Sequence, residues 1–213
     1  MTGHRQDFER DLEAIESKVI ELFALLAEDL PRATQALLSG KNEILQVIAE
    51  REQLVDALYP EIEELVNREI VLQSPVASDL RFLLSVLRIV PEIERSHDLV
   101  MHVASQANHI LFGDLTPRTR GLVERMGNLA SEMWRRTADS WYQRDRSVAL
   151  SLVDLDDDMD DLHASLIAEL ASGQMALPVT MEMTLVARDY KRLSAHAVNI
   201  ARRVVYLAGT TGS

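Results

Sequence analysis

Apolar residues recur along this chain at intervals of three and four positions, which is the period of an amphipathic helix. Only 8 glycines and 6 prolines interrupt its 213 residues, so we expect few helices and long ones. The pattern predicts helices over about residues 7–38, 41–72 and 76–112, and then over about 117–142, 147–170 and 179–207. The chain is therefore predicted to be all-α.

Turn residues separate these segments. Ser39-Gly40 ends the first predicted helix, and Gly113 ends the third. Thr116 is the expected N-cap of the fourth, with Pro117 at its first helical position. The third helix should bury an apolar face made of Leu80, Leu83, Leu84, Leu87, Ile93 and Val100, and the fourth a face marked by Trp134 and Trp141.

The two sets of three helices resemble each other residue by residue. Placing Leu58 over Leu162 sets Glu52 over Asp156 and Asp56 over Asp160. The third and sixth predicted helices align in the same way, with Arg95 over Arg192. We therefore expect a duplicated unit, folded as two tandem pseudo-symmetric three-helix bundles over residues 5–113 and 114–209.

Three pairs of carboxylates stand four positions apart, a spacing that places both side chains on one helix face. An acidic chain produces several such pairs by chance, so their position in the repeat is what gives them weight. A divalent cation would relieve the repulsion within each pair, whereas the alternative is a solvated charged surface. The pairs are Glu52 with Asp56, Glu94 with Asp98, and Asp156 with Asp160.

Two histidines suggest an enzymatic alternative. His97 follows Glu94 by three positions and His163 follows Asp160 likewise, which is the spacing of the ligands in ferritin-like di-iron carboxylate proteins. A di-metal oxidase or metal-storage protein is therefore the second hypothesis. It also needs inward glutamates from two further helices, and the two histidines do not correspond in the repeat. His102 and His196 are expected to be hydrogen-bonded packing residues.

Charge and composition exclude several classes of function. The formal charge of −12 makes binding to nucleic acid or to anionic lipid improbable. There is no cysteine, which excludes disulfides and thiolate zinc sites. A signal peptide, an apolar stretch long enough to span a bilayer, a glycine-rich phosphate loop and a nucleophile elbow are all missing. We expect a cytoplasmic protein that is not an enzyme.

Three stretches of sequence resemble the PhoU family of phosphate-transport regulatory proteins. The family's third-helix signature, Glu-Arg-Ile-Gly-Asp-His-Ala-x-Asn-Ile-Ala, is similar to residues 94–98 (ERSHD) and residues 191–201 (KRLSAHAVNIA). Its entry to the third helix, Gln-x-Pro-Val-Ala-x-Asp-Leu-Arg, is similar to residues 73–81 (QSPVASDLR). The resemblance runs in order from Phe8 to Leu207.

The resemblance implies a negative regulator of phosphate uptake and of the phosphate-starvation response. Such a protein links the ATP-binding subunit of the phosphate ABC transporter to a phosphate-sensing histidine kinase, so it meets the membrane only through protein partners. Some members of the family bind iron or zinc clusters on their acidic motifs, so the resemblance makes iron, zinc or another divalent metal on the carboxylate pairs a candidate cofactor. A homodimer is an assembly that the sequence neither requires nor excludes.

The second half departs from the family pattern. Lys191 and Ala195 stand where the family has an acidic residue, and a lysine ammonium close to Asp156 and Asp160 could neutralise them without metal. The metal is therefore expected in the first half, on Glu52, Asp56, Glu94 and Asp98, with Asp156 and Asp160 as a doubtful second site.

Overall fold

Six long helices make up the fold in a computed structural model that describes residues 2–109 and 112–209. The first three are α1 (Thr2–Ser39), α2 (Asn42–Gln73) and α3 (Ala77–Ser105). The short 3-10 turns η1 (Gln106–Asn108) and η2 (Phe112–Asp114) lead to α4 (Pro117–Gln143), α5 (Arg146–Ala171) and α6 (Leu177–Ala208). The all-α prediction is confirmed.

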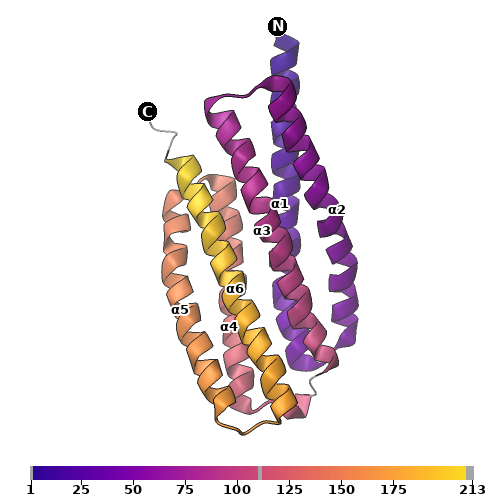
Figure 1. Cartoon of the computed structure of the whole chain (residues 1–213), viewed down its shortest axis with the longest axis vertical. Coiled ribbons are helices and arrows are strands. Elements are labelled where there is room, and N and C mark those ends of the chain that lie inside the picture. The colour runs from indigo at the N-terminus through magenta and orange to yellow at the C-terminus, as the bar shows by residue number, and fades with distance from the viewer. Residues whose placement is uncertain (1, 110–111, 210–213) are drawn as a thin grey trace.

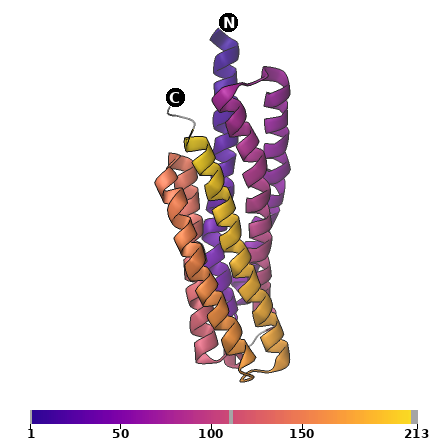
Figure 2. The same cartoon turned by 60° about the vertical axis from the view of Figure 1, so that its left-hand side comes forward.

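The helices run up and down along one elongated bundle (Figure 1). α1, α2 and α3 pack against one another on one side, and α4, α5 and α6 do so on the other. α1 begins and α6 ends at the same end of the molecule, as the second view also shows (Figure 2). No helix in the described part of the chain has the length and apolar character that crossing a membrane requires.

The predicted helix boundaries agree with the structure to within two residues, except that α1 begins five residues earlier than predicted, at Thr2, and that α3 ends earlier. That helix ends at Ser105, whereas the sequence pattern continued it to residue 112; residues 110 and 111 lie outside the described part. Ser105 Oγ donates to the carbonyl of His102 (2.7 Å), and the buried Gln106 amide donates to His102 Nε2 (3.1 Å). Such local polar contacts compete with the last helical hydrogen bonds and favour a tighter turn.

Side-chain caps set the starts of α4 and α5, whereas α6 begins without one. Thr116 Oγ1 accepts a hydrogen bond from the backbone N–H of Thr119 (3.1 Å), with Pro117 at the first helical position, as the sequence predicted. Asp145 caps α5 by accepting from the backbone N–H groups of Ser147 (2.7 Å) and Val148 (3.2 Å). These caps satisfy N–H groups that have no partner within the helix.

A single hydrophobic core runs through all six helices. The predicted inner residues Leu83 and Ile93 are fully buried, and Trp134 and Trp141 are 1% and 0% exposed. Leu84 is 45% exposed, so its assignment to the core was wrong. Adjacent residues on a helix point about 100° apart, and the core side of α3 passes through Leu83. Because the core is shared, the division at residues 113 and 114 into separate domains stays a prediction.

The two halves are in contact where α1 crosses α4, as well as where α3 packs against α6. Thr34 Oγ1 shares a buried hydrogen bond with the hydroxyl of Tyr190 on α6 (2.7 Å). Gly127 on α4 faces the same threonine, and a Cβ added there would lie 2.4 Å from Thr34 Oγ1 and 2.9 Å from its Cβ. The two helices can therefore approach this closely only because Gly127 has no side chain.

We expect Gly127→Ala to lower the free energy of unfolding by about 1 to 3 kcal/mol, because no rotamer of Thr34 removes the contact with its Cβ. Gly121→Ala on the same helix is the matched control, since nothing lies within 4 Å of its added Cβ. That control should be neutral or up to about 1 kcal/mol more stable. Urea denaturation measures both, and equal stability of the two variants would contradict the close crossing.

Candidate functional site

The structure brings the four carboxylates of the first half together, on the neighbouring helices α2 and α3. Glu52 and Asp56 lie one turn apart on α2, and Glu94 and Asp98 lie one turn apart on α3. Asp56 is close enough to act electrostatically on Glu52, Glu94 and Asp98. The four residues therefore lie within electrostatic range of one another, and their role as a metal site stays a prediction.

Three of the four carboxyl groups on this acidic face hold their protons more tightly than free carboxyl groups do. Partial burial raises the pKa of Glu52, Glu94 and Asp98, and repulsion from Asp56 raises all three further. The positive charge of Arg95 offsets only part of the rise in the pKa of Glu94. The clustered negative charge is thus unfavourable in the folded protein, and added positive charge would stabilise it.

None of these four side chains forms an ion pair with a basic residue within residues 2–109 and 112–209. The same described residues contain no group of three or more histidine or acidic side chains arranged to surround a metal ion. The carboxylates are therefore close enough to repel one another but are not gathered around a single point. Coordination of one ion by all four would need their side chains to turn toward a common point.

The equivalent face of the second half is neutralised by the chain itself. Lys191 Nζ lies 2.9 Å from Asp156 Oδ1 and 2.8 Å from Asp160 Oδ1. Ser194 Oγ also donates to Asp156 Oδ1 (2.7 Å). Burial lowers the pKa of Lys191, but the bonds to Asp160 and Asp156 reverse this and hold the pKa above its ordinary value. Lys191 therefore occupies the place of a cation, as its position in the sequence predicted.

His97, one of the two histidines of the enzymatic hypothesis, has another partner. His97 is 1% exposed and its Nε2 lies 3.1 Å from Oδ2 of Asp29, a fully buried carboxylate on α1. It is buried in the core, although it is close enough to the acidic face to lower the pKa of Glu52 and Asp98 electrostatically. His102 Nδ1 pairs with Asp189, and His196 Nδ1 is 2.8 Å from Ser96 Oγ. Both of these are packing residues between α3 and α6, as expected.

A buried polar network around Asp29 was not predicted from the sequence. The carboxylate accepts from Arg32 Nη1 (3.1 Å) and from Arg51 Nε (3.0 Å), besides its contact with His97. Asp29 has no exposed surface, so these partners compensate for its desolvation. The only signal in the sequence is a charged residue on the apolar face of the first predicted helix.

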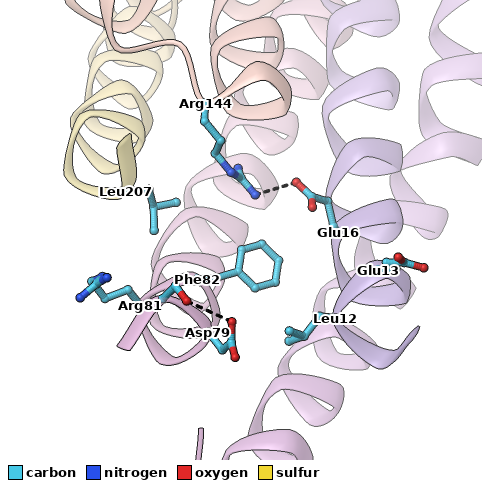
Figure 3. Close-up of a pocket in the computed structure, with 9 residues that line it drawn as sticks. Leu12, Glu13, Glu16, Asp79, Arg81, Phe82, Arg144 and Leu207 are labelled. Carbon is cyan, nitrogen blue, oxygen red and sulfur yellow. Dashed lines mark hydrogen bonds and ion pairs between the residues drawn. The ribbon is translucent and has the colours of Figure 1, made fainter. Parts of the chain in front are cut away.

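A small cavity at the end of the bundle was also missed. About 300 Å³ in volume, it lies between α1, α3 and the ends of α4 and α6. Figure 3 shows Arg144 reaching across it to Glu16, with Nη2 to Oε1 at 2.6 Å, above the ring of Phe82. The guanidinium also lies 4.4 Å from the centre of the Trp141 ring. Because its arginine is paired and stacked, the cavity is best explained as part of the packing between helix ends.

We expect Glu94→Gln plus Asp98→Asn to stabilise the metal-free protein at pH 7 by about 0.5 kcal/mol, the size of the repulsion within a solvent-screened acidic pair. Because the pKa values of Glu94 and Asp98 are raised, the folded state binds protons that the unfolded chain has released. The free energy of unfolding therefore falls as the pH rises through their titration. The double variant should lose that part of the pH dependence.

Thermal unfolding between pH 4 and 8 measures the effect, with Asp157→Asn plus Asp161→Asn as the control. This control removes the same charge from an exposed i, i+4 pair on α5. A double variant of the first pair that is less stable than the wild type would contradict the proposed repulsion.

Lys191→Met should have the opposite effect on the second half. It keeps the aliphatic stem but leaves Asp156 and Asp160 without their shared cation, so we expect a loss of about 1 kcal/mol that shrinks in high salt. Lys18→Met breaks a single interhelical pair with Glu61 (2.9 Å) and serves as control. Urea denaturation that shows the same small loss in both would contradict a special role for Lys191.

Comparison with known sequences agrees with this geometry. The PhoU domain family matches residues 19–107 and 123–204. The chain is 30% identical over 207 residues to the phosphate-specific transport system accessory protein PhoU homolog 2 of Mycobacterium tuberculosis, covering 96% of this chain and 97% of that protein. It is 29% identical over 213 residues to the PhoU homolog of Zymomonas mobilis, covering 98% and 89%.

Solved structures show the same fold. The crystal structure of PhoU from Pseudomonas aeruginosa superposes with a TM-score of 0.89 at 26% identity, covering 96% of this chain and all of that one. The phosphate transport system regulatory protein PhoU from Streptococcus pneumoniae is 24% identical, with a TM-score of 0.85 over 97% and 98% of the two chains. The matched residues include most of all six helices, so the chain belongs to the PhoU family.

Proposed function

We propose that this chain is an accessory regulator of phosphate transport that represses phosphate uptake and the phosphate-starvation response. The observation that carries the proposal is the likeness over nearly the whole chain, in sequence and in fold, to proteins named phosphate-specific transport system accessory proteins. The regulator acts on the cytoplasmic side, as an adaptor between the ATP-binding subunit of the transporter and a sensor histidine kinase.

The architecture supports an adaptor better than an enzyme. Two similar bundles locked by one core present two long faces in a fixed relation, which suits a body that contacts two partners at once. When the chain binds both partners, each partner is present at a higher effective concentration near the other. No turnover is needed for this role. The di-metal oxidase hypothesis loses support, because its histidine ligand His97 is hydrogen-bonded to Asp29 within the core.

A divalent cation on the first bundle is part of the proposal. Glu52, Asp56, Glu94 and Asp98 supply only carboxylate oxygens, which iron, zinc and harder cations all accept. The raised pKa values of Glu52, Glu94 and Asp98, and the absence of an ion pair to any of the four within the described residues, favour such a counter-charge. The cation would offset the repulsion and stiffen the contact between α2 and α3. Asp156 and Asp160 remain doubtful ligands, since Lys191 already bridges them.

The regulatory role is tested in cells that lack the gene and grow in rich phosphate. Alkaline phosphatase and uptake genes should then be switched on, and the wild-type gene should restore repression. Repression by Glu94→Gln plus Asp98→Asn should be weaker than by the control Asp157→Asn plus Asp161→Asn. Normal repression in the deleted strain would contradict the proposed regulatory role. Equal repression by the two variants would show that the acidic face is not needed for that role.

A further inference from the structure

Arginines gather along the seam where α3 packs against α6, on a chain whose net charge is −12. Arg88, Arg95, Arg202 and Arg203 line a groove of about 610 Å³ between the two helices. Arg192 is exposed beside it, close enough to Arg95 that both act on the same histidine of α6. The seam is thus a positive stripe on an acidic molecule.

These arginines are only partly balanced by the chain, since Arg95 acts electrostatically on Glu94 and Arg192 on Asp189. Within the described ranges, none of the five forms an ion pair with a carboxylate. Arg202 donates to the side-chain oxygen of Asn199 (3.3 Å), and the guanidinium of Arg203 lies 5.9 Å from the centre of the Tyr206 ring. Other arginines of this protein do find carboxylates, as Arg51 does with Glu28 and Asp29. The stripe is therefore available to external negative charge.

One acidic residue lies in the groove. Glu92 has an Oε2 atom that is buried without a hydrogen-bond partner, and the closest cationic group to it is Nε2 of His196 at 3.8 Å. Burial lowers the pKa of His196, so the histidine is weakly charged at neutral pH and compensates Glu92 poorly. A compact anion at the middle of the groove would meet this carboxylate and be repelled.

The positive charges are instead spread along the seam. At about 1.5 Å per residue, Arg88 and Arg95 stand roughly 10 Å apart along α3, and Arg192 and Arg203 roughly 16 Å apart along α6. Between them the groove is lined by Pro91 and the aliphatic stems of the arginines, with Ile89 and Ile200 buried beneath. Aliphatic surface with basic edges fits an amphipathic segment that carries acidic side chains on both flanks.

We propose that the α3–α6 groove is the docking site for an acidic, amphipathic segment of a protein partner. The charge complementarity selects the partner and speeds its association, and the groove supplies the apolar contact. This inference rests on the proposed adaptor role in that the occupant is a protein. The groove is a different site from the acidic face of α2 and α3, so a negative result for one of the two proposals does not contradict the other.

The test is fluorescence anisotropy with a labelled helical peptide built from glutamate, leucine and alanine. A peptide with glutamine in place of glutamate is the second probe. The glutamate peptide should bind more tightly, and its affinity should fall steeply with salt. Arg88→Gln plus Arg202→Gln should weaken binding on the order of tenfold. Glu92→Gln should tighten it, which damage to the fold would not do.

The matched control is Arg135→Gln plus Arg146→Gln, which removes the same charge from exposed residues of α4 and α5. It should leave binding nearly unchanged. Equal loss in both double variants, or no binding of the glutamate peptide, would overturn the proposal. So would competition by tripolyphosphate or by phosphatidylglycerol vesicles that outmatches the unlabelled peptide, because the groove would then recognise a non-protein anion. This assay measures peptide binding by the purified protein and not phosphate repression in cells, so its outcome and that of the regulatory test are independent.

Discussion

The close crossing of α1 and α4 is the constraint on which the rest of the structure depends. A glycine at position 127 lets the two helices approach, and Thr34 then reaches Tyr190 of α6 through a buried hydrogen bond. This contact fixes the first bundle against the second and allows one core to run through both. The acidic face on α2 and α3 and the arginine stripe at the α3–α6 seam are thereby held on one rigid body.

The two halves balance the negative charge of their carboxylate pairs in different ways. Each places a pair of carboxylates on its second helix, at equivalent positions. In the second half Lys191 bridges Asp156 and Asp160, so the charge is balanced internally. In the first half Glu94 occupies a comparable place on the third helix, adds to the negative charge and leaves it open to a cation. The two halves therefore differ in charge balance at positions that the sequence repeat aligns.

The helices and much of the acidic site were predictable because both depend on spacing along the chain. The apolar period located all six helices, and the repeat aligned Glu52 with Asp156. Contacts between distant segments were not predictable. The bond between His97 and Asp29 joins residues 68 positions apart, and the arginine stripe forms only when α3 lies against α6. The end of α3 was misplaced because local polar contacts of Ser105 and Gln106 outweighed the apolar pattern.

The difference in charge balance between the two halves is tested most directly by adding Mn²⁺ to the isotopically labelled protein and following amide signals by NMR. A bound paramagnetic ion broadens the signals of nearby amides. The account predicts selective broadening around Glu52, Asp56, Glu94 and Asp98, with Asp156 and Asp160 little affected. Broadening that is equal in both halves, or stronger around Lys191, would contradict it.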